Sequence, residues 1–165
     1  MTNKTLDLTT TGQDTHPIDW PLYTEKLATA LALLEEAEFL ILVLKGTNRF
    51  VQFSAQGDNG MRAETTSNAY LSGSQRLDDS QIGALLALGW YSPTGSPEEA
   101  ATPDLDPCGS PNYFGHIVAP VPFKEVAEWA VKTLTEVLGA PNPACLEYEH
   151  FASPAPEVID FRRDL

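Results

Sequence analysis

The feature that most constrains the fold is a series of three short segments with strand character, separated by turn-forming residues. Residues 39–44 (FLILVL) are apolar throughout and are followed by KGTN, and residues 49–55 and 61–66 are separated by QGDNG. Short apolar runs bounded by Gly and Asn favour strands over helices. Loops this short join antiparallel neighbours. The three segments therefore predict an antiparallel meander.

Helical periodicity appears before and after the meander. Apolar residues recur at spacings of three and four over 20–37, 79–88 and 122–138, which predicts three amphipathic helices. Asp19 is placed to cap the first helix. Gly89 is placed to close the second in a left-handed conformation.

Two further strands, at 112–119 and 145–151, complete the expected order α-β-β-β-α-β-α-β. Strands that follow one another in a run, with helices flanking them, are typical of the α+β class. We therefore expect a meander extended by one or two strands into one mainly antiparallel sheet, with helices packed on one face.

The 165 residues are expected to form a single α+β domain over 18–151, with flexible tails at 1–17 and 152–165. Residues 92–111 contain five prolines, four acids and no base, so we expect an exposed insertion loop.

The two cysteines, Cys108 and Cys145, are not in a C-x-x-C motif and are expected to be free thiols in a reducing compartment. No run has the apolar length of a signal peptide or a bilayer span. We therefore expect a cytoplasmic protein.

The charge balance restricts the class of partner. The chain has 23 acidic and 10 basic residues, a formal net charge of −13. Such a chain repels phosphate backbones and anionic lipid head groups, so neither nucleic acid nor a membrane is expected as a partner. A basic or amphipathic polypeptide fits better, and a role of the charge in solubility alone is the other interpretation.

Side chains alternate between the faces of a strand, so the turns fix which residues lie opposite one another. A turn symmetric about Asp58 places Phe53 opposite Ala63 and Gln52 opposite Glu64. The face with Phe53 is then apolar and meets the helices.

The other face is polar except where the first strand crosses it. A turn at 45–48 places Val43 opposite Phe50 and Ile41 opposite Gln52. Ile41, Val43 and Phe50 would then form an apolar island among polar groups, which commonly marks a partner surface. Coverage of the island by a helix or by the C-terminal tail is the alternative.

Few residues of the sequence suggest catalysis or metal binding. A catalytic pair with Cys108 as nucleophile and His116 as base has no supporting local pattern, and a free thiol is the preferred interpretation of Cys108. The three histidines have no metal-ligand spacing. A solvated acidic cluster explains Glu35, Glu36 and Glu38 better than paired catalytic acids. We therefore expect a protein that is not an enzyme and has no catalytic residue, metal or cofactor.

The order FLILVL, RFVQFSA, MRAETTSNAYL, LGWYSP and NYF, followed by an amphipathic helix, resembles the YbjN-like peptide-binding chaperones. These are grouped with type III secretion chaperones in the TY-Chap superfamily, and the resemblance covers roughly residues 20–150. It implies a helix–meander–helix fold, often dimeric, that binds an unfolded or amphipathic peptide without ATP. The insertion at 92–111 and the residues after Phe151 depart from the pattern.

We therefore predict a small chaperone or adaptor that holds an extended or amphipathic client segment on the meander or at its edge. The alternative is an acidic inhibitor or immunity protein that binds one folded basic partner. The helix over 79–88 either packs against its own copy in a homodimer or is buried within one subunit. The candidate partner-binding residues are Ile41, Val43, Phe50, Gln52, Arg62, Glu64, Asn68 and Trp90.

Overall fold

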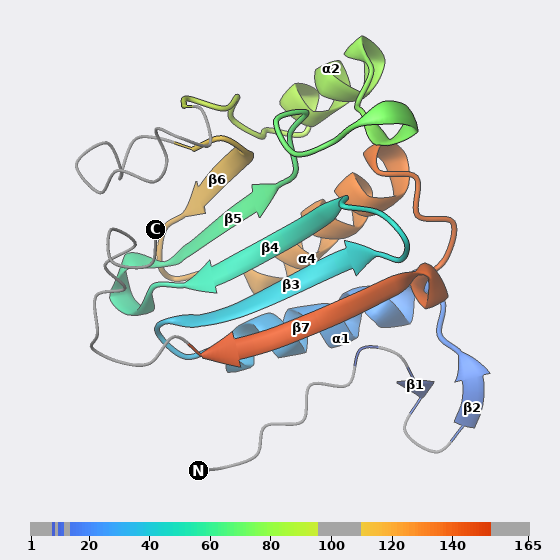
Figure 1. Cartoon of the computed structure of the whole chain (residues 1–165). Coiled ribbons are helices and arrows are strands. Elements are labelled where there is room, and N and C mark those ends of the chain that lie inside the picture. The colour runs from blue at the N-terminus through green and yellow to red at the C-terminus, as the bar shows by residue number, and fades with distance from the viewer. Residues whose placement is uncertain (1–7, 9, 12–13, 96–109, 153–165) are drawn as a thin grey trace.

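Five strands form one antiparallel sheet in the order β6-β5-β4-β3-β7 (Figure 1). The computed structural model of the chain describes residue 8 and residues 10–11, 14–95 and 110–152. The strands and helices are β1 (Thr10–Thr11), β2 (Asp14–Pro17), α1 (Trp20–Leu33), β3 (Glu38–Leu44), β4 (Phe50–Ala55), β5 (Met61–Thr65), α2 (Asp79–Ala87), β6 (Tyr113–Ile117), α4 (Phe123–Lys132), η3 (Thr133–Val137) and β7 (Leu146–Ala152). From α1 onward, this order confirms the α+β prediction.

The pairing of β3, β4 and β5 confirms the predicted meander and its register. Ile41 lies opposite Gln52, and Val43 lies opposite Phe50. Gln52 also lies opposite Glu64 on its other side. The hairpins determine this register because short turns and the two-residue alternation leave few ways to pair the strands. β7, the last strand of the chain, adds beside β3.

The helices α1 and α4 pack against each other and lie together behind the sheet (Figure 1). The side chains of β4 alternate between buried and half-buried along the strand, as expected when only one face meets the helices. The hydrophobic core lies between this sheet face and the two helices, and it includes Leu27 and Leu31 of α1, Leu40 and Leu42 of β3, Val51 and Phe53 of β4, and Ala127 and Ala130 of α4.

The helix starts follow the sequence signals. The side chain of Asp19 accepts a hydrogen bond from the backbone N–H of Leu22 at 3.0 Å. Asp78 and Gln81 form a reciprocal capping box at the start of α2. Gly89 follows α2 with a φ of +99°, a conformation that glycine adopts without strain.

The first helix ends earlier than predicted. α1 stops at Leu33 instead of residue 37, and Leu34 is already extended. The acids that follow are unfavourable near the negative end of a helix dipole. Ala37 then takes a positive φ of 67° as the chain turns into β3.

The segment before α1 contains structure that the sequence did not indicate. Thr10–Thr11 pairs with Asp14–Pro17 in a small two-stranded sheet. The side chain of Leu8 is fully buried and belongs to the hydrophobic core. Residues 1–7, 9 and 12–13 and residues 153–165 of the tail expected at 152–165 lie outside the described residues, whereas Ala152 is the last residue of β7.

Arg49, at the β3–β4 turn, holds three segments together. Its guanidinium donates to the carbonyl of Gln75 at 2.9 Å and to that of Leu138 at 3.1 Å. A planar group with several donors suits this task because it can reach separate carbonyls at once. The meander is thereby attached to the loop before α2 and to the residue after η3. Within the described part of the chain, no helix has the length and apolar character needed to cross a membrane.

Candidate functional site

The sheet face opposite α1 and α4, called the open face below, gathers most of the predicted binding residues. Strand pairing places on it Phe39, Ile41 and Val43 of β3, Phe50, Gln52 and Ser54 of β4, Arg62 and Glu64 of β5, Phe114 and His116 of β6, and Glu147, Glu149 and Phe151 of β7. Among the described residues, no helix covers this face, as seen from the front in Figure 1.

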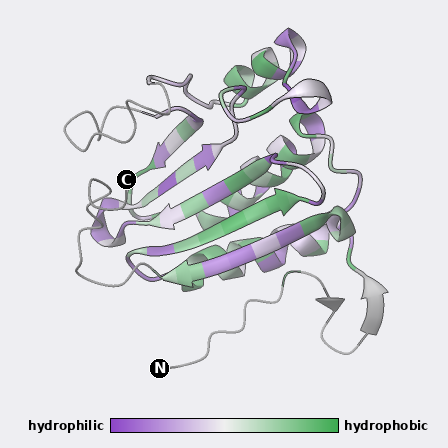
Figure 2. Cartoon of the chain, in the orientation of Figure 1, coloured by the Kyte–Doolittle hydropathy of each residue, from purple (hydrophilic) through white to green (hydrophobic). Residues whose placement is uncertain are grey.

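The apolar island predicted from the sequence is present on the open face. Ile41, Val43 and Phe50 are each half-buried, although no described helix lies over them. Figure 2 shows why: after Glu38 at its start, β3 is hydrophobic up to its last residue, while the middle of the neighbouring β7 is hydrophilic. A strand that is apolar on both faces must leave one apolar face outside the core.

Two aromatic side chains extend this island toward the sheet edge. Phe39 of β3 and Phe151 of β7 lie directly opposite each other, and their rings stack with centroids 5.1 Å apart. Phe151 keeps 45% of its surface exposed. We use the name apolar island for the set Phe39, Ile41, Val43, Phe50 and Phe151. Neither phenylalanine was among the predicted binding residues, because their proximity depends on β7 lying beside β3.

A polar band borders the apolar island on β4 and β5. The amide of Gln52 donates to one carboxylate oxygen of Glu64, and the guanidinium of Arg62 lies 3.2 Å from the other oxygen. Ser110 donates to that second oxygen at 3.0 Å. The Arg62 guanidinium also lies 5.0 Å from the centroid of the Phe114 ring. The predicted contact residues Gln52, Arg62 and Glu64 are therefore fixed in place by one another.

Two predicted binding residues lie elsewhere. Asn68 belongs to the loop after β5, where its side chain accepts from the N–H of Leu77 at 2.7 Å and donates to the same residue's carbonyl at 2.9 Å. It closes the loop before α2 and does not join the open face.

Trp90 is a core residue, so its assignment to a binding surface needs correction. Only 2% of it is exposed, its ring stacks on Trp129 with centroids 3.9 Å apart, and its indole N–H donates to the Thr133 hydroxyl at 2.9 Å. A buried indole needs such a partner for its N–H. These contacts join the end of α2 to α4.

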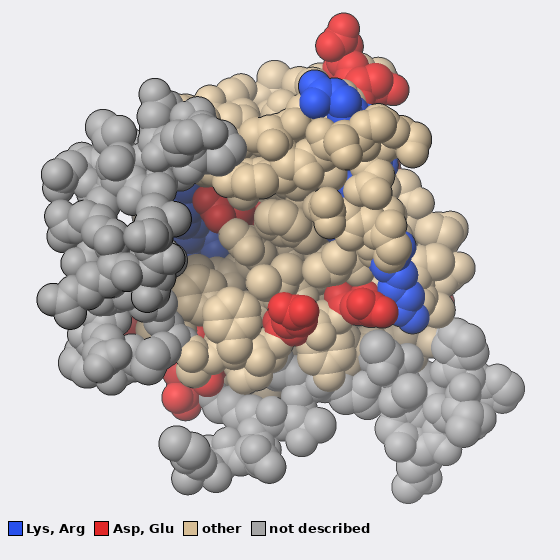
Figure 3. Space-filling model, in the orientation of Figure 1, with Lys and Arg blue, Asp and Glu red and all other residues tan. Residues whose placement is uncertain are grey.

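Charges on the open face are mostly acidic toward β7. Figure 3 shows the uncharged surface that covers the middle of this face, with separate acidic groups along it and fewer basic ones. Glu147 and Glu149 are exposed, and they flank the apolar island on the side of the sheet edge.

The described residues contain little that could perform chemistry. They include no group of three or more His, Cys, Asp or Glu side chains that could hold a metal ion. Cys145 is a free thiol directly before β7. Cys108 and residues 96–109 of the expected insertion lie outside the described residues, and His116 is exposed on β6. The Oε2 atom of Glu38 lies 3.7 Å from Nε2 of His150 on the helix-facing side.

The described ends of the expected insertion lie side by side. The N–H of Thr94 donates to the carbonyl of Ser110 at 2.8 Å, and Tyr91 and Phe114 exchange backbone hydrogen bonds. The chain therefore leaves and returns at one point, next to β6.

A family model described as T3SS (YopN, CesT) and YbjN peptide-binding chaperone 3, TY-Chap3, matches residues 13–152. The match includes every strand and helix from β2 to β7. The chain belongs to the TY-Chap3 family. This assignment agrees with the resemblance found in the sequence. No curated protein and no solved structure matches the chain. TY-Chap3 is a family of peptide-binding chaperones, so a protein or peptide client is the class of partner that it indicates.

Proposed function

We propose that the open face holds an extended or amphipathic client segment against the apolar island, with no catalytic step. The observation that carries this proposal is the apolar island itself. Its five residues remain on a face opposite the packed helices, next to polar groups that are already paired. A soluble protein that keeps contiguous apolar side chains outside its core commonly uses them to bind a partner.

The arrangement suits a segment more than a folded domain. A single row of apolar side chains from β3, with Phe50 and Phe151 beside it, matches the alternate side chains of one extended chain. The net charge of −13 would favour encounter with a basic client. We also propose that the protein works in the cytoplasm, where Cys145 would remain reduced.

The proposal is tested by capture of partners from a lysate of the protein's own host. The wild-type protein, Phe50→Asp and the control Leu86→Asp would each be tagged and their captured proteins identified by mass. Leu86 lies on α2 and is 46% exposed, so its replacement introduces the same charge away from the open face.

The expected result is a partner captured by wild type and by Leu86→Asp and lost by Phe50→Asp. Overlapping 15-residue peptides of that partner should then include a linear segment that binds. A partner that binds only when folded would support the inhibitor or immunity interpretation instead. Unfolding of Phe50→Asp, monitored by circular dichroism, would show that Phe50 belongs to the core, and Phe151→Asp would then take its place in the test.

A further inference from the structure

The apolar island lies beside the last described residue of the chain. β7 ends at Ala152, and Phe151, the residue before it, stacks on Phe39 in the apolar island. Residues 153–165 follow and lie outside the described residues. These thirteen residues reach at most about 43 Å when fully extended, whereas the part of β3 from Phe39 to Val43 is about 13 Å long. They are therefore long enough to return along the whole island.

The sequence after β7 divides into a linker with two prolines and a segment with alternating character. Residues 153–156 read SPAP, and residues 157–165 read EVIDFRRDL. Proline lacks a backbone N–H, so Pro154 and Pro156 disfavour continuation of β7 as a paired strand. In an extended chain alternate side chains share a side. One side of the 157–165 segment would then carry Glu157, Ile159, Phe161, Arg163 and Leu165, and the other Val158, Asp160, Arg162 and Asp164.

The rows of side chains on the open face match the first of these sides in spacing and in order. Successive rows across β7 and β3 pair Phe151 with Phe39, Glu149 with Ile41, and Glu147 with Val43. Neighbouring rows are two residues apart, about 7 Å, which is also the spacing of alternate side chains in an extended segment. A segment that turns back after β7 meets two aromatic rings first. It then meets two rows that each combine an apolar side chain with a carboxylate.

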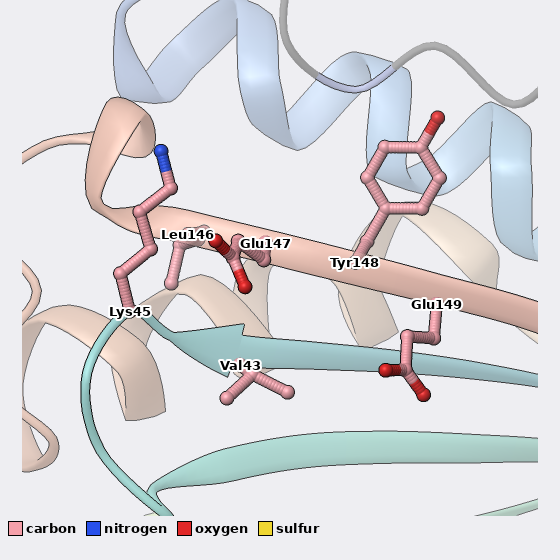
Figure 4. A pocket seen from close by; sticks show the side chains of 6 residues that line it. All are labelled: Val43, Lys45, Leu146, Glu147, Tyr148 and Glu149. Atoms are coloured by element: carbon pink, nitrogen blue, oxygen red, sulfur yellow. The ribbon is translucent and has the colours of Figure 1, made fainter.

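A hollow of about 500 Å³ lies at the last of these rows. Its lining residues are Val43, Lys45, Leu146, Glu147, Tyr148 and Glu149 (Figure 4). Figure 4 shows the Tyr148 ring and the Glu149 carboxylate on opposite sides of β7, with Lys45 near the start of the strand. Glu147 and Glu149 are exposed, and no basic group of the described residues forms an ion pair with either. The hollow therefore suits a cationic side chain that arrives along the open face.

We propose that residues 157–165 of the same chain fold back onto the open face and occupy the apolar island until a client displaces them. The contacts assigned are Ile159 on the Phe39–Phe151 pair, Phe161 on Ile41, and Arg163 beside Glu147 in the hollow. Val158 and Asp160 then face away from the sheet. The inference rests on the proposed function only for the final step, displacement of the segment by a client.

The short connection favours this segment over the same segment of a second copy. Residues 153–158 join Ala152 to Ile159 and span up to about 23 Å, whereas a chain packed on a sheet face lies about 10 Å from it. A short linker of this kind gives an effective concentration in the millimolar range. A second copy must also approach against the repulsion of two net charges of −13. Contact within one chain is therefore the favoured arrangement.

The contact is tested first by methyl NMR of the full chain without any client. Phe161→Ser removes the central aromatic contact, and Val158→Ser is the matched control on the opposite side of the segment. In the wild type we expect nuclear Overhauser effects between the Phe161 ring and the Ile41 methyl groups. The Ile41 and Val43 signals should move in Phe161→Ser and stay in place in Val158→Ser. The Leu86 signals, on the exposed part of α2, should stay in place in both variants.

Access to the apolar island is tested with a blocked peptide of sequence EVIDFRRDL, added to the full chain. Its affinity is measured by fluorescence anisotropy at fixed ionic strength. Phe161→Ser should bind the peptide about tenfold more tightly than wild type, because its own segment no longer competes. Val158→Ser should bind it as wild type does. Addition of Phe50→Asp to the Phe161→Ser variant should abolish binding, since the peptide then meets a charge on the island.

Two peptides of equal charge test the role of the hollow. Arg163→Gln in the peptide removes the cation assigned to the hollow, and Arg162→Gln removes its neighbour on the other side. The first change should weaken binding to the Phe161→Ser protein roughly two- to fivefold, as expected for an exposed ion pair, and the second should change it little. Glu147→Gln/Glu149→Gln in the protein should remove the difference between the two peptides. Equal losses for both peptides would overturn the assigned alternation.

Unchanged Ile41 and Val43 signals in Phe161→Ser, or equal changes in Phe161→Ser and Val158→Ser, would overturn the inference. Overhauser effects found only between an isotope-labelled and an unlabelled copy would identify a second copy as the occupant, which also overturns it. A client that binds wild type and Phe161→Ser with equal affinity would overturn the inference and leave the proposed function intact. Contact of Phe161 with Ile41, but no partner captured by either protein, would support the inference and contradict the proposed function.

Discussion

The rings of Phe39 and Phe151 stack with their centroids 5.1 Å apart, across the junction of β3 and β7. These residues are 112 positions apart in the chain, taking 151 minus 39, yet they lie directly opposite each other in the sheet. Because Phe151 is 45% exposed, the pair is both a packing contact within the sheet and an accessible apolar surface.

Replacement of Phe151 by Ala should therefore separate binding from folding. Loss of the stacked pair is expected to lower the free energy of unfolding by about 0.5–1.5 kcal/mol, in addition to the lost burial of a half-exposed ring. Affinity for the client segment should fall more clearly, because the apolar island loses one end. Urea denaturation and peptide binding measured on the same sample would test this. An unchanged affinity would remove Phe151 from the proposed site.

Two glycines provide a matched test of packing. A Cβ atom on Gly115 of β6 would lie 2.8 Å from the Trp129 ring, whereas one on Gly83 in the middle of α2 would meet no atom within 4 Å. Gly115→Ala should lower the free energy of unfolding by about 1–3 kcal/mol because Trp129 is held by Trp90. Gly83→Ala should raise it by about 0.5–1 kcal/mol through better helix propensity. Chemical denaturation measures both, and equal effects would contradict the packing of β6 on α4.

Arg49 should contribute more to stability than a typical half-buried arginine. Arg49→Ala leaves the carbonyls of Gln75 and Leu138 without their donor, so we expect a loss of about 2–3 kcal/mol in the free energy of unfolding. Arg49→Lys should recover only part of it, since one ammonium cannot reach the same set of carbonyls. Denaturation midpoints report the difference. A change below about 0.5 kcal/mol in the Ala variant would show that this attachment is unimportant.

The buried phenol of Tyr23 makes the free energy of unfolding depend on pH in the alkaline range. Burial in the core raises its pKa well above the ordinary value of 10.0, and the neighbouring Tyr148 adds a smaller contribution in the same direction. The Tyr23 phenol therefore loses its proton at a lower pH in the unfolded chain than in the folded protein. Because this ionisation stabilises the unfolded chain, the free energy of unfolding falls as the pH rises above about 10. The loss attributable to Tyr23 is at most about 1.4 kcal/mol per pH unit.

Tyr23→Phe should show a shallower decline than wild type between pH 10 and the onset of alkaline unfolding. Each variant is compared with its own value at pH 7, which separates ionisation from the packing change caused by loss of the hydroxyl. Parallel declines would show that the Tyr23 phenol is not shielded from water.

Local features were predictable from the sequence because they depend on neighbours in the chain. The pairs Val43–Phe50 and Gln52–Glu64 follow from two short turns and from strand alternation. The capping residue Asp19 was also predictable, since a cap bonds to the backbone only three residues away.

Features that depend on distant contacts were not predictable. The alternation of Glu147, Glu149 and Phe151 was visible, but nothing local indicated that β7 pairs with β3. Trp90 follows a helix-ending glycine and was predicted as a partner-binding residue, yet Thr133, 43 residues later, accepts its N–H and Trp129 covers its ring. The burial of Leu8 likewise depends on contacts that its polar neighbours gave no reason to expect.

The most direct test of client binding on the open face is a methyl NMR titration of the wild-type protein. The ligand is a client segment identified with the overlapping 15-residue peptides of a captured partner. The methyl groups of Ile41 and Val43 lie in the apolar island, whereas those of Leu86 are exposed on α2. Binding on the open face predicts saturable shifts of the Ile41 and Val43 signals, with those of Leu86 unchanged. Shifts of the Leu86 signals without any shift of Ile41 and Val43 would place the client on another surface and contradict the proposed function.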